Sequence, residues 1–141
     1  MSFLFSKKSK KEPTRLFFAT DLHGSERTFR KFINAGKFYN VNVIVMGGDI
    51  QGKLMIPIIK EANGRHRATL QGRVEQLSNQ EELGYLTGRL DILGFYYKIM
   101  EEDEFHALQA DRKAVDRLFN ELARKKLDGW VNFAEERLDG T

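Results

Sequence analysis

Cysteine is absent from the sequence, and no apolar run is long enough to cross a bilayer. Without cysteine there is neither a disulfide framework nor a thiolate metal site, so a bound metal must be held by His, Asp, Glu or Asn side chains. The opening letters MSFLF are followed by lysines, whereas a secretory signal places its positive charge before a longer apolar stretch. We therefore expect a cytoplasmic protein with no membrane partner.

A strong net charge is also lacking. The formal net charge is +3, and lysines at positions 7, 8, 10 and 11 account for it, so the remainder of the chain is close to neutral. We expect residues 1–13 to form a basic, disordered leader, and we expect no specific nucleic-acid partner. The 141 residues, of which 41% are hydrophobic and 30% charged, are enough for one compact globular domain.

Residues 14–59 predict a strand, a helix and a second strand. Residues 15–20 (RLFFAT) are a short apolar run, and residues 41–46 (VNVIVM) are the β-branched run of a parallel strand that is covered on both faces. Between them, Ser25 is a helix cap that is followed by apolar residues at the spacing of one helical face: Phe29, Phe32, Ile33 and Gly36. Such a βαβ unit is right-handed and parallel, so both strands end at the same edge of the sheet.

Three side chains of types that can bind metals follow these two strands. Asp21 and His23 come after the first strand, and Asp49 comes after Gly47 and Gly48 at the end of the second. Open α/β sheets bind ligands at this edge, and the offset of two residues lets Asp21 and His23 point the same way if the backbone stays extended. A set of carboxylates and an imidazole suits Mn, Fe, Zn or Ni better than Ca or Mg. We therefore expect Asp21, His23 and Asp49 to be metal ligands.

The segments TDLHGS and MGGDI resemble the first two motifs of the calcineurin-like metallophosphoesterases. The pattern of that family is D-x-H, then G-D, then G-N-H-[DE], then a lone His, then G-H-x-H. The resemblance implies an α/β sandwich and a hydrolase that acts on phosphoesters, as a phosphatase or a phosphodiesterase. It also implies that Asp21 and His23 bind a first metal ion and that Asp49 bridges two ions, which activate water for attack on phosphorus.

The later motifs of the family are missing. No G-N-H-[DE] or G-H-x-H follows Asp49, and the other histidines are His66, which we interpret as a turn residue, and His106, which we interpret as a surface helix residue. The resemblance covers the first third of the chain, so we expect a truncated, N-terminal portion of a longer enzyme with little or no phosphoesterase activity as given. An uncovered sheet edge would allow self-association.

A different class of function stays open. In this alternative, the chain is a non-catalytic α/β binding module that holds at most one weakly bound metal ion. A complete module of this kind is expected to be a compact monomer.

Residues 60–141 predict short strands and helices of an insertion or cap region. Strands are expected within 66–77 and 94–100, and helices are expected over 79–93, over 101–109 and from 111 onward, with the last apolar stripe resuming beyond Gly129. Core packing is the expected role of the aromatic residues Phe95, Tyr96, Tyr97 and Trp130. The acidic run 101–104 is expected to be a solvated helix start.

Overall fold

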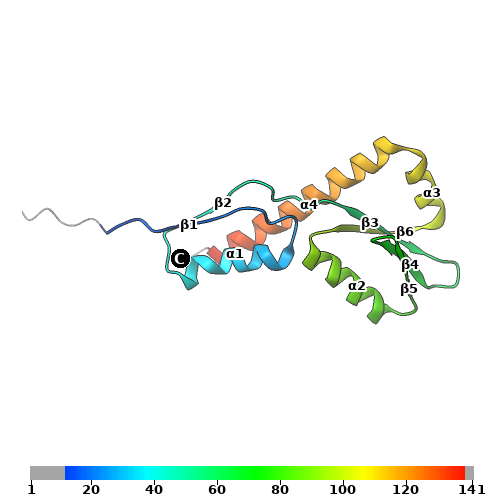
Figure 1. The fold of residues 1–141 in the computed structure, drawn as a ribbon, viewed down its shortest axis with the longest axis horizontal. Coiled ribbons are helices and arrows are strands. Elements are labelled where there is room, and N and C mark those ends of the chain that lie inside the picture. The colour runs from blue at the N-terminus through cyan, green and yellow to red at the C-terminus, as the bar shows by residue number, and fades with distance from the viewer. Residues whose placement is uncertain (1–11, 139–141) are drawn as a thin grey trace, which may run out of the picture.

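The structure is a computed structural model that describes residues 12–138. Apart from residues 12 and 13, the predicted leader lies outside this range. The described chain is mixed α/β, with two separate sheets and four helices (Figure 1). Its elements in order are β1 (Leu16–Ala19), α1 (Glu26–Phe38), β2 (Val43–Met46), β3 (Met55–Lys60), β4 (His66–Leu70), β5 (Arg73–Leu77), α2 (Gln80–Leu93), β6 (Tyr96–Glu101), α3 (Glu102–Ala110) and α4 (Arg112–Leu138).

The first sheet confirms the predicted βαβ unit. Strands β1 and β2 are parallel, with Leu16 opposite Val43 and Ala19 opposite Met46, and α1 connects them. Helix α1 begins where the Ser25 side chain accepts a hydrogen bond from the backbone N–H of Thr28 at 3.3 Å, as the capping prediction requires. Its buried residues are those of the predicted helical face, with Ala35 in place of Gly36: Phe29, Phe32, Ile33 and Ala35.

Only one face of this sheet is covered, so the prediction that the second strand is covered on both faces is wrong. Phe17, Ala19, Ile44 and Met46 pack against α1 and the C-terminal part of α4. On the opposite face, the side chains of Leu16 and Phe18 are each 58% exposed, and no third strand pairs with β1 or β2 among residues 12–138. The sheet therefore exposes both an apolar face and two strand edges.

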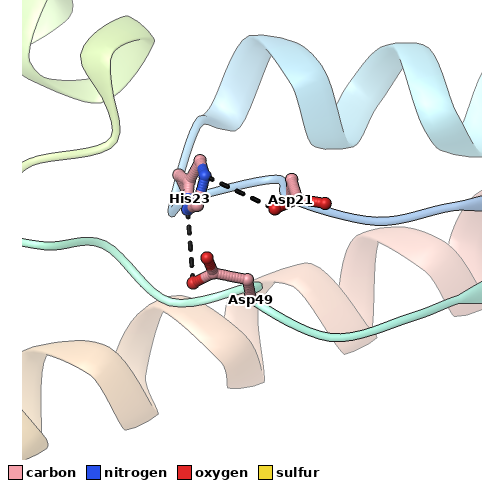
Figure 2. Close-up of side chains that lie close together, drawn as sticks. All are labelled: Asp21, His23 and Asp49. Atoms are coloured by element: carbon pink, nitrogen blue, oxygen red, sulfur yellow. Dashed lines mark ion pairs between the residues drawn. The ribbon is translucent and has the colours of Figure 1, made fainter.

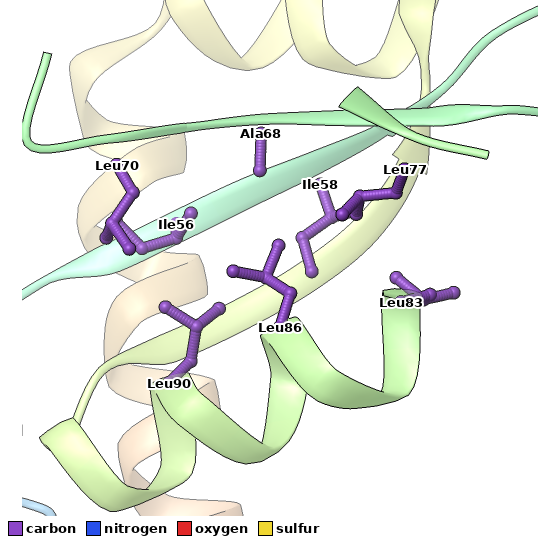
Figure 3. Close-up of a cluster of buried hydrophobic side chains, with 8 residues drawn as sticks. All are labelled: Ile56, Ile58, Ala68, Leu70, Leu77, Leu83, Leu86 and Leu90. Carbon is purple, nitrogen blue, oxygen red and sulfur yellow. The ribbon is translucent and has the colours of Figure 1, made fainter. Parts of the chain in front are cut away.

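The second sheet has the strand order β5-β4-β3-β6, in which β3 pairs antiparallel with β4 and parallel with β6. Helix α2 covers one face of it, and Leu83, Leu86 and Leu90 point from the helix toward the strands (Figure 3). The eight buried residues of this core are Ile56, Ile58, Ala68, Leu70, Leu77, Leu83, Leu86 and Leu90. Strands β4, β5 and β6 and helix α2 confirm the predicted elements.

Strand β3 was not predicted. Its sequence, MIPIIK, carries Pro57 at the third position, and a proline argues against a central strand because it cannot donate a ladder hydrogen bond. Pro57 lies opposite Lys98 of β6, and the pairing of β3 with β4 begins one residue later, at Ile58. The strand spans the predicted boundary between residues 59 and 60, and it belongs to the second sheet.

Helix α4 joins the two halves of the molecule. It runs for 27 residues and continues through Gly129, where the sequence pattern suggested an interruption. Near its start, Phe119 meets Tyr96 of β6 with ring centroids 5.1 Å apart, and near its end Trp130 stacks on Phe29 of α1 at 4.3 Å. Figure 1 shows this helix reaching from the second sheet to the first. Tyr96 and Trp130 are 5% and 3% exposed, which confirms their predicted core role.

The start of α3 is also as predicted. Glu102, Asp103 and Glu104 form its acidic first turn, where negative charge favours a helix. Within the described range, no helix combines the length and the hydropathy that a bilayer crossing requires.

Candidate metal centre

The three predicted ligands meet at one edge of the first sheet. Asp21 and His23 lie in the loop after β1, and Asp49 lies in the loop after β2 (Figure 2). His23 Nε2 is 3.8 Å from Asp21 Oδ1, and His23 Nδ1 is 3.3 Å from Asp49 Oδ1. One potential ligand atom from each residue lies within 4.8 Å of the other two. The strand ends therefore bring the three side chains together as predicted, and metal binding itself stays a prediction.

Backbone hydrogen bonds continue the pairing of the two strands into these loops. The N–H of Asp21 donates to the carbonyl of Gly48 at 3.1 Å, that of His23 donates to the carbonyl of Asp49 at 3.1 Å, and that of Gly24 donates to the carbonyl of Ile50 at 2.8 Å. These bonds tie the loop that carries Asp21 and His23 to the loop that carries Asp49. The relative positions of the ligands therefore depend on main-chain contacts and not only on side-chain rotamers.

The expectation of an extended backbone between Asp21 and His23 is wrong. Both residues have positive φ angles, 60° and 48°, and Asp49 has a φ of 54°. The left-handed conformation costs an L residue roughly 1–2 kcal/mol, and aspartate adopts it more readily than most because its short polar side chain can bond locally. Strained residues persist where surrounding contacts hold them, and they often cluster at functional sites. Here the three candidate ligands converge through turns and not through strand alternation.

Three glycines pack against each other behind the candidate ligands. A Cβ atom on Gly94 would lie 1.8 Å from the carbonyl oxygen of His23, and one on Gly52 would lie 2.2 Å from the carbonyl oxygen of Gly94. A Cβ on Gly24 would lie 2.7 Å from the Cα of Gly52. The loop after β1, the loop after β2 and the α2–β6 turn can therefore cross only because these residues have no side chains.

Two hydrogen bonds connect this crossing to the second half of the molecule. The Ser25 hydroxyl donates to the carbonyl of Ile92 at 2.7 Å, and the N–H of Gly52 donates to the Tyr96 hydroxyl at 2.9 Å. Sequence reasoning missed these contacts. A glycine after a predicted helix does signal a C-terminal cap, which Gly94 is, but its contact with the His23 loop is not encoded in any local pattern.

The chemistry of the donor set fits a divalent metal ion. The side chains of Asp21 and Asp49 are 60% and 57% exposed, and that of His23 is 33% exposed, so solvent and ligands can reach the site. His23 Nδ1 is nevertheless buried and makes no hydrogen bond, because Asp49 Oδ1 is near enough for an ion pair but lies outside hydrogen-bond geometry. Buried polar atoms normally have a partner. A metal ion among these donors would supply the positive charge that balances the two carboxylates.

Sequence reasoning also missed Lys53. Its Nζ lies 3.4 Å from His23 Nε2, so it is a cationic neighbour of the candidate ligands. The only local signal is its position four residues after Asp49, in a loop that contains a glycine.

The other two histidines are not part of this group. His66 begins strand β4 and is buried at 7% exposure, so its interpretation as a turn residue is wrong: its side chain lies on the strand face that α2 covers. His106 is exposed on α3, as predicted, and its Nε2 lies 3.4 Å from Glu102 Oε1. Among residues 12–138, Asp21, His23 and Asp49 are the one group of three acidic or histidine side chains placed to hold a metal.

The chain matches no known family model, no curated protein and no solved structure. The resemblance to the calcineurin-like metallophosphoesterases therefore depends on the two motifs and on what their residues are able to do.

Proposed function

We propose that this protein binds a divalent metal ion through Asp21, His23 and Asp49, and that the site serves metal-dependent phosphoester hydrolysis of the calcineurin-like type. The observation that carries the proposal is the convergence of three ligand atoms to within 4.8 Å at the carboxyl ends of two parallel strands. Neither motif alone predicts this geometry, because helix α1 and strand β2 separate His23 from Asp49 in the chain.

The residues have distinct roles in this proposal. The carboxylates of Asp21 and Asp49 neutralise the ion, and the His23 imidazole favours Mn, Fe, Zn or Ni over Ca or Mg. A divalent ion bound there would activate a water molecule and stabilise the charge that develops on the phosphoryl oxygens. Three protein ligands leave positions for water and substrate, and the exposure of both carboxylates keeps those positions accessible.

The number of ions is part of the proposal. The family resemblance implies two, with Asp49 between them, whereas the described residues supply one group of three candidate ligands. We propose that this group holds one ion and that turnover by this chain is slow. One site without the supporting residues of a second is expected to bind its ion weakly, because partners beyond the direct ligands orient those ligands and raise affinity.

The binding step is tested by titrating Mn²⁺ into the wild-type protein, Asp49→Asn and His23→Gln, with free Mn²⁺ measured by electron paramagnetic resonance. Asp116→Asn is the matched control, because Asp116 is an exposed aspartate on α4, far from the site in the chain. We expect one bound ion in the wild type and in the control, and at least tenfold weaker binding in the two site variants. Equal affinity in all four proteins would refute the assignment of ligands.

The hydrolysis step separates the enzyme from the alternative function. The second candidate is a non-catalytic binding module, and the single three-ligand group favours it. Hydrolysis of p-nitrophenyl phosphate and bis(p-nitrophenyl) phosphate is followed with Mn²⁺, with and without Asp49→Asn. Slow hydrolysis that requires both Mn²⁺ and Asp49 supports a phosphoesterase. Mn²⁺ binding with no Asp49-dependent hydrolysis of either compound assigns the chain to the binding module.

A further inference from the structure

Lys53 contacts the candidate metal site without having a carboxylate partner. Its Nζ lies 3.4 Å from His23 Nε2, and its side chain is exposed. Within the described part of the chain, none of the ion pairs involves Lys53. Its only polar side-chain partner there is His23 Nε2, one of the two ring nitrogens through which a histidine can bind a metal.

The backbone next to Lys53 is held firmly. The N–H of Gly52 donates to the buried Tyr96 hydroxyl, and Gly52 packs against the carbonyl of Gly94 so closely that no side chain fits. Earlier in the same loop, the carbonyl of Ile50 accepts from Gly24. The long, flexible lysine side chain therefore starts from a fixed point beside the site, and its approach to His23 follows from the fold of the loop.

Charge indicates what Lys53 is placed to bind. A divalent ion neutralises the two carboxylates of Asp21 and Asp49, so the ammonium group of Lys53 gives the metal-loaded site a net positive charge. A phosphoryl group brings negative charge and several acceptor oxygens, and lysine binds such groups as a point charge. Building on the proposed function, we propose that Lys53 binds a phosphoryl oxygen of the substrate once a metal ion is bound by Asp21, His23 and Asp49.

A purely structural role for Lys53 has different consequences. If the ammonium group only holds His23 in position, its loss should disturb the ligand and weaken metal binding. If it binds the phosphoryl group, its loss should leave Mn²⁺ binding intact or tighten it, because a cation near the ion is removed, and should weaken anion binding alone. Metal affinity and anion affinity measured on the same variant therefore separate the two roles.

The test is calorimetric titration of orthophosphate into Mn²⁺-saturated wild-type protein, Lys53→Gln and Lys53→Arg. The control is Lys113→Gln, which changes an exposed lysine at the start of α4. We expect Lys53→Gln to weaken orthophosphate binding about tenfold, as loss of one charge-assisted hydrogen bond does, and Lys53→Arg to retain most of the affinity. The control is expected to match the wild type, and Mn²⁺ affinity is expected not to fall in any variant.

Any other result would overturn the role of Lys53, and one of them would also overturn the proposed metal site. Three results would overturn the role of Lys53 and leave the metal-site proposal intact. They are equal orthophosphate affinity in the wild type and Lys53→Gln, no orthophosphate binding to a wild type that binds Mn²⁺, and a parallel loss of Mn²⁺ and orthophosphate affinity. Absence of Mn²⁺ binding to the wild type overturns the proposed function, and the role of Lys53 with it.

Discussion

The carbonyl oxygen of His23 packs directly against Gly94, at a distance where a Cβ atom would come within 1.8 Å of it. Gly94 caps the C-terminus of α2, the helix that packs on the second sheet, whereas His23 follows the first strand of the first sheet. The loop that carries a candidate metal ligand therefore rests on the other half of the molecule.

We expect Gly94→Ala to lower the free energy of unfolding by more than about 2 kcal/mol and to weaken Mn²⁺ binding. The φ of +78° is unfavourable for alanine, and the added methyl group would push the His23 loop away. Gly88→Ala is the matched control, since nothing lies within 4 Å of a Cβ at this α2 position, and alanine should stabilise the helix by roughly 0.5–1 kcal/mol. Urea titrations measure both, and equal stability of the two variants would disprove the packing argument.

Mn²⁺ should stabilise the fold in proportion to its binding. At a free concentration a hundred times the dissociation constant, an ion that binds only the folded state adds about 2.7 kcal/mol. Thermal unfolding with and without Mn²⁺ should show this gain in the wild type and not in Asp21→Asn, and a chelator should reverse it. A gain of the same size in Asp21→Asn would place the ion elsewhere.

Trp130 should anchor α4 to α1. Its ring stacks on Phe29 with an interplanar angle of 1°, and its Nε1 donates to Glu26 Oε2 at 2.6 Å. We expect Trp130→Ala to cost about 3–5 kcal/mol in urea unfolding. Trp130→Phe keeps an aromatic ring but loses a hydrogen bond to a charged group, so it should cost less, roughly 1.5–3 kcal/mol. A loss below 1 kcal/mol in Trp130→Ala would show that α4 does not depend on this contact.

The uncovered face of the first sheet should promote self-association. Phe18 is 58% exposed on this face, beside two unpaired strand edges. We expect concentration-dependent association in sedimentation velocity, and we expect Phe18→Thr to reduce it, since threonine is less apolar but is still favoured in strands. Tyr85→Thr serves as control, because Tyr85 is 71% exposed on α2, away from this sheet. A monomer at all concentrations would contradict the prediction.

The charge of Asp111 should support the start of α4 in a pH-dependent manner. Burial raises the pKa of Asp111, but hydrogen bonds from the Ala114 N–H, the Arg117 side chain and the Lys113 N–H lower it by more, so that the net pKa lies below its ordinary value. A carboxyl group with a lowered folded pKa stabilises the fold above its unfolded pKa of about 3.9, and this contribution is lost as the pH falls through the folded value.

The variant Asp111→Asn isolates this charge, because asparagine can still cap the helix. The wild type should be more stable than the variant at pH 7, and the difference should begin to shrink below about pH 4 and disappear once Asp111 is protonated in the folded state as well. Thermal unfolding at a series of pH values measures it. A difference that stays constant from neutral to acid pH would show that the charge has no part in it.

Local patterns predicted much of the fold because their physical causes are local. The strands at residues 15–20 and 41–46 were recognisable from short apolar runs, and α1 from its cap and helical spacing, since each depends on neighbours in the chain. Strand β3 was not predicted. Pro57 weakens the strand pattern of its sequence, and its pairing partners in β4 and β6 come from later segments of the chain.

For the candidate site, the sequence by itself determined which three side chains meet and the edge of the sheet at which they meet. Two parallel strands joined by a helix must end on the same side, so Asp21, His23 and Asp49 had to converge. Only the tertiary structure decided how they are held, by left-handed turns and by the crossing of three glycines, and that Lys53 lies beside His23. Those contacts join segments far apart in the chain, and their energies arise only when the two halves pack together.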